Sequence, residues 1–132
     1  MTKKLLIVTL LLQIAVLAFA QMAGGYEPFN DSARLESLKW LAIKEINAKS
    51  KIPENYIPLK ITNAQSQIVA GFNYEFSLEV VQADCLKTAV NHAQLKANKC
   101  NAKKGGKKQV YKMHIYEPLE PNKEDVKILS SS

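Results

Sequence analysis

Alternation between apolar and polar side chains is the clearest pattern in the chain. Over Phe72–Val80 every second side chain is apolar, and the side chains between them are polar or charged. A period of two is typical of an antiparallel strand that buries one face. A weaker alternation at Leu59–Thr62 predicts the partner strand. Alternation returns over Val110–Tyr116 and at Val126–Leu129, which predicts a third and a fourth strand. We expect residues 130–132 to fray.

Apolar residues spaced three and four apart predict one helix that runs to about Lys49, with Asn30, Asp31 and Ser32 as candidates for its N-cap. Pro53 and Pro58 bracket the loop that follows and prevent the helix from continuing. The single Trp40 flanks the apolar stripe, and we expect it to pack in the core. One helix followed by four antiparallel strands predicts an α+β domain with the helix laid across one sheet face. The residues of the stripe are Leu35, Leu38, Ala42 and Ile46.

The beginning of the chain has the pattern of a secretory signal peptide. Lys3 and Lys4 precede an almost wholly apolar run, Leu5–Leu17, and Ala18-Phe19-Ala20 is a small-x-small cleavage site. The run is shorter than the roughly 20 residues that a membrane span needs. The sequence therefore predicts a signal peptide at residues 1–20, a mature domain at residues 21–132, no membrane anchor and an extracellular location.

Charge is concentrated in one segment. The net charge is +6, and many of the lysines lie in residues 96–108. Such a run is usually a solvated loop. No aromatic residues alternate with these lysines, so the sequence does not favour nucleic-acid binding.

Cys85 and Cys100 are the two cysteines of the chain. In a secreted protein an even pair predicts a disulfide. The alternative is a zinc site or a catalytic thiol that uses His92 or His114, but the spacings match no metal pattern. His114 falls on the polar side of its strand, so we expect it to be solvated. With both cysteines bonded, no nucleophile–base pair is evident, and we expect neither enzyme activity nor a metal or other cofactor.

The stretch Gln67–Gly71 connects the first two predicted strands, yet its centre is apolar, at Ile68 and Val69. An exposed apolar turn suggests a contact surface, and Gly71 permits a sharp turn. The alternative is that Ile68 and Val69 begin the next strand and are buried. In a meander, turns two connections apart lie at the same end of the sheet, so Pro118-Leu119 should lie beside this turn. We expect the preceding arm, residues 21–29, to be mobile.

The chain resembles the cystatin family of cysteine protease inhibitors. The resemblance rests on Gln67-Ile68-Val69-Ala70-Gly71, which has the form Gln-x-Val-x-Gly, and on the glycines of the arm, Gly24 and Gly25. The helix end Ala42–Asn47 and the proline at Pro118 are also similar to the family. This resemblance implies a cystatin-like fold, in which one long helix packs across a four- to five-stranded antiparallel sheet.

The resemblance also implies a function. Secreted cystatins are reversible inhibitors of papain-like cysteine proteases, of the cathepsin and papain type, and fill the active-site cleft with the arm and two hairpin turns. We expect such proteases as partners, and we expect a monomer. The residues that the resemblance assigns to protease binding are Gly24, Gly25, Gln67, Ile68, Val69, Ala70, Gly71, Pro118 and Leu119.

The sequence departs from the family pattern in two places. Leu119 stands where secreted members usually carry Trp, and the cysteines allow one disulfide where two are usual. These departures keep a second hypothesis open: a non-inhibitory cystatin-fold binding or effector protein, for example a venom or saliva component, that acts through its basic loop.

Some relatives inhibit legumain through an Asn after the helix. Asn55 is a poor substitute by position, so we do not expect this activity.

Overall fold

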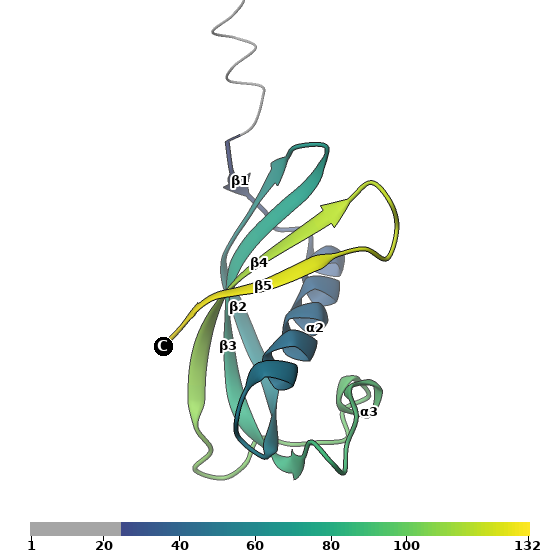
Figure 1. Cartoon of the computed structure of the whole chain (residues 1–132). Helices are drawn as coiled ribbons and strands as arrows, with labels where there is room; N and C mark the ends of the chain where they lie inside the picture. Colours follow the sequence, from purple (N-terminus) through teal and green to yellow (C-terminus); the bar gives the residue numbers. More distant parts are fainter. Residues whose placement is uncertain (1–24) are drawn as a thin grey trace, which may run out of the picture.

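The computed structural model describes residues 25–132, which fold as a helix packed across a five-stranded antiparallel sheet (Figure 1). The strands follow one another in the sheet in chain order, β1-β2-β3-β4-β5. The predicted α+β architecture, with one long helix across a four- to five-stranded antiparallel sheet, is therefore confirmed. The predicted signal peptide at residues 1–20 and Gly24 lie outside the described residues. The elements are β1 Glu27–Pro28, α2 Ser32–Lys49, β2 Glu54–Ile68, β3 Gly71–Leu86, α3 His92–Lys96, β4 Lys108–Pro118 and β5 Asp125–Ser131.

Helix α2 has the predicted bounds because its ends are capped. The side chain of Asp31 accepts a hydrogen bond from the backbone N–H of Arg34, at 3.0 Å. At the other end, the Ser50 N–H donates to the carbonyl of Ile46 at 2.8 Å. Trp40 is 9% exposed, as predicted for a core residue. The helix residues that are buried against the sheet are Leu38, Trp40, Ala42, Ile43 and Ile46.

The sheet buries one face under α2, as the alternation predicted. Pro58 lies inside β2 and not in the loop after the helix, so the predicted loop is too long. The register of β2 against β3 shifts at Pro58/Lys60, and such an irregularity accommodates a residue that has no N–H to donate. The buried apolar residues of the neighbouring strands β3 and β4 include Tyr74, Phe76, Leu78, Val80, Tyr111, Met113 and Ile115.

Both ends of the described chain are paired, although the sequence predicted that they would be mobile or frayed. Glu27 and Pro28 pair with Ser66 and Gln65 of β2 as a two-residue strand. At the other end, Ser132 exchanges two backbone hydrogen bonds with Val110, at 2.8 and 2.9 Å. The prediction of fraying at residues 130–132 is therefore wrong, because the edge of β4 supplies the backbone partners that an isolated end would lack.

The segment between β3 and β4 is joined to the sheet by the disulfide between Cys85 and Cys100, with a Cα–Cα distance of 5.9 Å. The predicted pairing of the two cysteines is thus present. The short helix α3 lies inside the closed segment and begins with a capping box formed by Asn91 and Gln94. Among the described residues, no helix is long and apolar enough to cross a membrane.

Candidate functional site

Two turns lie next to each other at one end of the sheet (Figure 1). The first joins β2 to β3 through Val69 and Ala70, and the second follows β4 at Leu119. Gly71 pairs with Pro118 in the β3–β4 register. The Tyr116 hydroxyl also donates a hydrogen bond to the Ala70 carbonyl, at 2.9 Å. The side-by-side position predicted from the meander is therefore confirmed.

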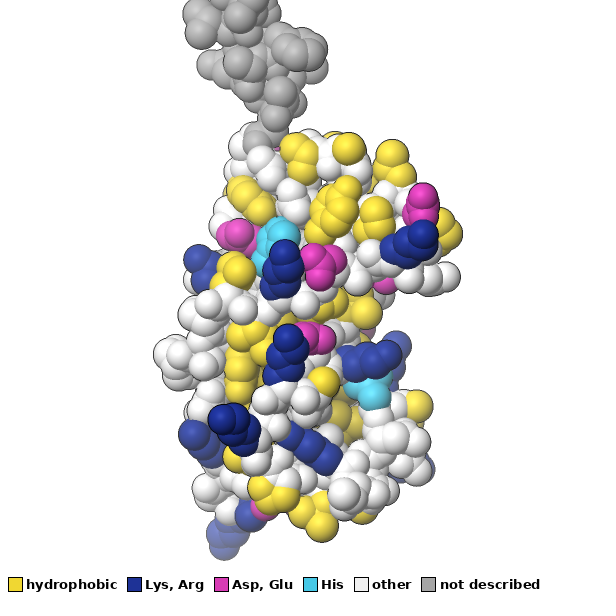
Figure 2. All heavy atoms as spheres, viewed as in Figure 1, with side chains coloured by type: hydrophobic (Ala, Val, Ile, Leu, Met, Phe, Trp, Pro, Cys, Tyr) yellow, Lys and Arg dark blue, Asp and Glu magenta, His cyan; other side chains and the backbone are white. Residues whose placement is uncertain are grey.

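The side chains of these turns are exposed although they are apolar. Ile68 is 72% exposed, Val69 38% and Leu119 79%, and Phe72 beside them is also exposed. The alternative that Ile68 and Val69 are buried at the start of a strand is thus wrong. Apolar side chains gather at this end of the molecule (Figure 2). We call Ile68, Val69, Phe72 and Leu119 the apolar edge.

The backbone of the first turn requires a glycine. Gly71 has a φ of +133°, which side-chain-bearing residues rarely adopt. A Cβ at this position would lie 2.5 Å from the carbonyl oxygen of Glu117. The absence of a side chain at Gly71 is therefore what lets β4 approach the turn and place the two turns together.

A polar cluster beneath the edge connects it to the helix. Arg34, in the first turn of α2, forms an ion pair with Glu117, the residue before Pro118. The guanidinium carbon of Arg34 lies 5.4 Å from the centre of the Tyr74 ring, and the Tyr74 hydroxyl donates to Glu117 at 3.4 Å. Burial raises the pKa of Tyr74, which favours the protonated form of its hydroxyl, the form that can donate. Sequence reasoning missed this cluster, because no local pattern relates Arg34 to Glu117.

A row of polar side chains crosses three strands just below the turns. The Asn73 amide donates to Gln67 at 3.2 Å, and its oxygen lies 3.0 Å from Nε2 of His114. His114 is half-buried, not fully solvated as the sequence suggested. The row connects β2, β3 and β4 on the face of the sheet opposite Tyr74 and so restrains the base of the first turn.

The arm enters the site from β1. Because β1 pairs with Ser66, next to Gln67, the chain that precedes it approaches the first turn. Gly25 is exposed, and a Cβ there would meet nothing within 4 Å.

Three side chains with possible metal-ligand atoms lie together at the disulfide. Within residues 25–132, the side chains close enough together to hold a metal are those of Asp84, Cys85 and Cys100. The sulfurs of Cys85 and Cys100 are bonded to each other in the disulfide. Thiolate ligands are therefore not available there.

Comparison with known proteins decides the family. The profile described as Cystatin domain matches residues 24–118, which include the first turn and end at Pro118, just before Leu119. The chain belongs to the cystatin family. Members of this family are known as cysteine protease inhibitors rather than enzymes, and this membership supports a cysteine protease inhibitor role here.

Two nematode cystatins are similar to this chain along much of their length. Cystatin cpi-1 of Caenorhabditis elegans is 35% identical over 98 residues, which are 74% of this chain and 70% of the relative. Cystatin cpi-2 of Brugia malayi is 30% identical over 117 residues, which are 83% of this chain and 71% of the relative.

Solved cystatin structures have the same fold. The crystal structure of Al-CPI has a TM-score of 0.68 at 27% identity and covers 83% of this chain and 96% of its own. Mialostatin, a gut cystatin from the hard tick Ixodes ricinus, has a TM-score of 0.60 at 22% identity. The match covers 82% of this chain and 95% of the mialostatin chain. The second likeness shows the fold alone.

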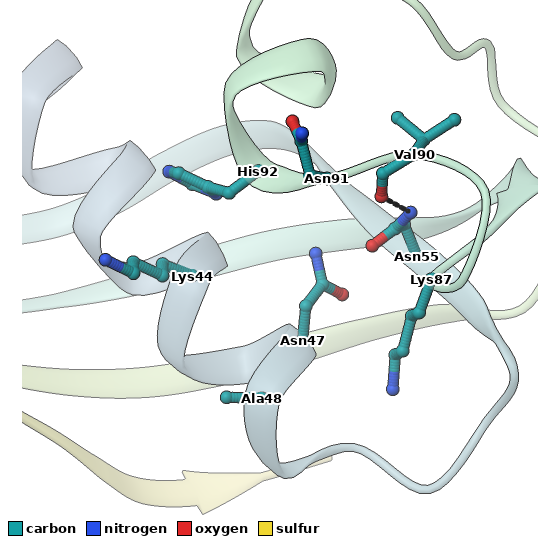
Figure 3. A pocket seen from close by; sticks show the side chains of 8 residues that line it. All are labelled: Lys44, Asn47, Ala48, Asn55, Lys87, Val90, Asn91 and His92. Atoms are coloured by element: carbon teal, nitrogen blue, oxygen red, sulfur yellow. Dashed lines mark hydrogen bonds between the residues drawn. The ribbon is translucent and has the colours of Figure 1, made fainter.

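Asn55 of this cystatin has a structural role. It is 5% exposed, and its amide donates to the Val90 carbonyl at 3.2 Å, as the dashed line in Figure 3 marks. A buried amide held in this way would have to break its hydrogen bonds to reach a protease. The arrangement agrees with the expectation that Asn55 is not a legumain-binding residue.

Proposed function

We propose that this cystatin is a secreted, reversible inhibitor of papain-like cysteine proteases. The observation that carries the proposal is the apolar edge, in which Ile68, Val69 and Leu119 are exposed on two turns joined by the Gly71–Pro118 pairing. Large apolar side chains exposed together on a small protein favour a protein partner.

In the proposed complex, the edge and the arm enter the active-site cleft of the protease. Gln67–Gly71 and Pro118-Leu119 occupy the primed side of the catalytic thiol, and the chain around Gly24 and Gly25 occupies the non-primed side. No peptide bond of the inhibitor lies in line with the thiol, so the inhibitor is not cleaved. The cleft is closed to substrate by occlusion alone.

The energy of this complex comes from apolar burial with matched shapes. An interface of standard size buries about 800 Å² on each partner. The pairing of Gly71 with Pro118 and the ion pair of Arg34 with Glu117 support both turns before binding. Because little conformational freedom is then lost on association, the ordering cost is small and tight binding is favoured.

The direct test is inhibition of papain by the mature protein and by Val69→Asp. A carboxylate at this exposed position leaves the core intact but would be desolvated in the cleft, so we expect the inhibition constant to rise by about 10- to 100-fold. Leu86→Asp is the matched control, because Leu86 is also an exposed apolar residue but lies at the other end of β3. The control should inhibit like the parent protein.

Two results would overturn this proposal. Full papain activity at micromolar concentrations of the parent protein would replace it with the non-inhibitory effector hypothesis. Equal inhibition by the parent and by Val69→Asp would remove the apolar edge from the mechanism.

Deleting the arm through Gly25 tests the contribution of the arm to inhibition separately. We expect weaker inhibition with an unchanged fold.

A further inference from the structure

Lysines are concentrated toward the end of the molecule opposite the apolar edge (Figure 2). Residues 84–108 contain seven lysines and a single acidic residue, Asp84. Around the second turn the balance is reversed, with four acidic residues and one lysine in residues 117–125. The end that holds residues 84–108 is therefore basic, and the turn at residues 117–125 is acidic, although the net charge of the whole chain is positive.

The centre of this lysine-rich end of the molecule is an ordered turn, residues 103–108, with the sequence Lys-Lys-Gly-Gly-Lys-Lys. The Gly106 N–H donates to the Lys103 carbonyl at 2.8 Å, and Gly105 has a φ of +69°. Backbone hydrogen bonds of 2.9 Å join Lys103 and Lys107 to Gln82 of β3. A Cβ on Gly106 would lie 2.9 Å from the Gln82 carbonyl, so the glycine permits this close approach. The lysines are thus presented from a fixed backbone.

A basic groove begins beside this turn. A cavity of about 350 Å³ lies between the end of α2 and the sheet, and Lys49, Lys51 and Lys107 contribute to its wall. Ser50 and Gln109 add polar groups, and no carboxylate side chain lines it. Lys49 is also paired with Glu45, at 3.2 Å, so the ammonium groups of Lys51 and Lys107 are the ones that an anion in this groove would meet without a neighbouring carboxylate in the wall.

A second basic cavity, of about 210 Å³, lies on the other side of the same helix end (Figure 3). Lys44 and His92 lie on one side of Asn47 and Lys87 on the other, and again no carboxylate lines the cavity. Burial, with Lys44 and Lys96 nearby, lowers the pKa of His92, which is the direction expected in a positive potential. We call the turn and the two cavities the basic end.

We propose that the basic end binds a sulfated polysaccharide. Lysine ammonium groups on an exposed turn, with amide and hydroxyl groups in the adjoining cavities, suit a flexible chain that carries many sulfates. Binding of this kind is dominated by charge and by counterion release, and it tolerates variation in the chain.

Other polyanions fit less well. Tyr56 and Tyr111, the tyrosines that line the groove, are buried, so they offer no exposed ring on which nucleic-acid bases could stack. In the fully described segment 84–108, Leu86 is the one exposed large apolar side chain, which gives little for insertion into a bilayer. The basic end therefore favours a polysaccharide over a nucleic acid or a membrane.

A bound polysaccharide would leave the apolar edge accessible. Strand β3 runs from Gly71 at the edge to Leu86 at the basic end, roughly 50 Å of extended chain. This is several times the screening length of about 8 Å at physiological salt. If the proposed function is correct, the inhibitor can be held on a polysaccharide and bind a protease at the same time.

The test is retention of the mature protein on immobilised heparin in a salt gradient. The variant Lys104→Gln/Lys107→Gln/Lys108→Gln removes three charges from the basic end and spares Lys103, which is paired with Glu54 at 3.4 Å. The control variant, Lys60→Gln/Lys112→Gln/Lys127→Gln, also removes three charges, but from strands β2, β4 and β5 outside the basic end. We expect the first variant to elute at much lower salt, with a log–log salt slope smaller by about 2 to 3. The control should stay near the parent.

The alternatives have their own readouts. Equal elution of the two variants would show that net charge alone retains the protein, and equal binding to desulfated heparin would exclude sulfate recognition. Tighter binding to single-stranded DNA or to phosphatidylserine vesicles than to heparin would replace the partner class. Each of these results overturns the proposal. Papain inhibition measured on the same variants separates a failure here, in which inhibition persists, from a failure of the proposed function.

Discussion

At the scale of single residues, Gly71 shapes the backbone of the first turn. Its positive φ turns the chain, and its missing side chain leaves room for the Glu117 carbonyl. A bulky substitution at this position would disturb the β3–β4 pairing as well as any contact with a protease. Val69 and Leu119 are better probes of binding, because both are exposed and their side chains do not hold the fold together.

Gly71→Ala should lower the free energy of unfolding by about 2–4 kcal/mol, because it combines an unfavourable φ with a backbone clash. Urea unfolding measures this change. Gly25→Ala is the control, since a Cβ there meets nothing within 4 Å and should alter stability by less than about 0.5 kcal/mol. Equal stability of the two variants would contradict the close approach of β4.

Leu119→Trp should strengthen inhibition of papain by about tenfold, because the larger ring buries more apolar area in the cleft. Leu119 is 79% exposed, so the core has no need to adjust. Leu129→Trp is the comparison, since Leu129 is an exposed leucine on β5, away from the apolar edge. Unchanged inhibition by Leu119→Trp would place this residue outside the interface.

At the scale of elements, the packing of α2 on the sheet buries tyrosines from three neighbouring strands. Tyr56 of β2, Tyr74 of β3 and Tyr111 of β4 are all buried, and the rings of Tyr56 and Tyr111 lie 6.1 Å apart. Burial raises the pKa of each phenol, and for Tyr111 the nearby Tyr56 adds to the effect.

These raised pKa values predict alkaline unfolding. The unfolded chain, in which the phenol pKa is about 10, releases its phenol protons at lower pH than the folded chain does. The tyrosines' contribution to the free energy of unfolding is therefore complete below about pH 10. It is lost as the pH rises through the higher pKa values of the folded state. Urea unfolding at a series of alkaline pH values should show this fall. Tyr56→Phe should make it shallower, since one titrating group is gone; an identical slope would contradict the role assigned to burial.

At the scale of the whole molecule, we propose a separate role for each of the two ends. The apolar edge lies at one end of β3, and the disulfide, α3 and the basic turn lie at the other. The core residues of the sheet and of α2 lie between the two ends. We therefore expect changes at the basic end to alter stability or polyanion binding while inhibition is preserved.

Removal of the disulfide tests this separation. Cys85→Ser/Cys100→Ser opens a closed segment with a sequence separation of 15. Unfolding should then require about 3 kcal/mol less free energy in the chain-entropy view. Papain inhibition, measured where circular dichroism shows the variant folded, should equal that of the parent. A matching loss of inhibition would show that the two ends are coupled.

Local patterns were enough to predict the helix, its cap and the main strands. The stripe from Leu35 to Ile46 and the alternation from Phe72 to Val80 reflect the periods of a helix and a strand, and each period is set by neighbours in the chain. The apolar turn at Ile68-Val69 and its position beside Leu119 also followed, because a meander constrains which turns share an end.

Contacts between distant parts of the chain could not be predicted in this way. The pairing of β1 with β2, the bonds of Ser132 to Val110, the ion pair of Arg34 with Glu117 and the grooves beside α2 all depend on register and packing. Sequence periodicity shows which face of an element is buried, but it does not show which residue of another element lies opposite. That choice is made when the sheet and the helix pack together.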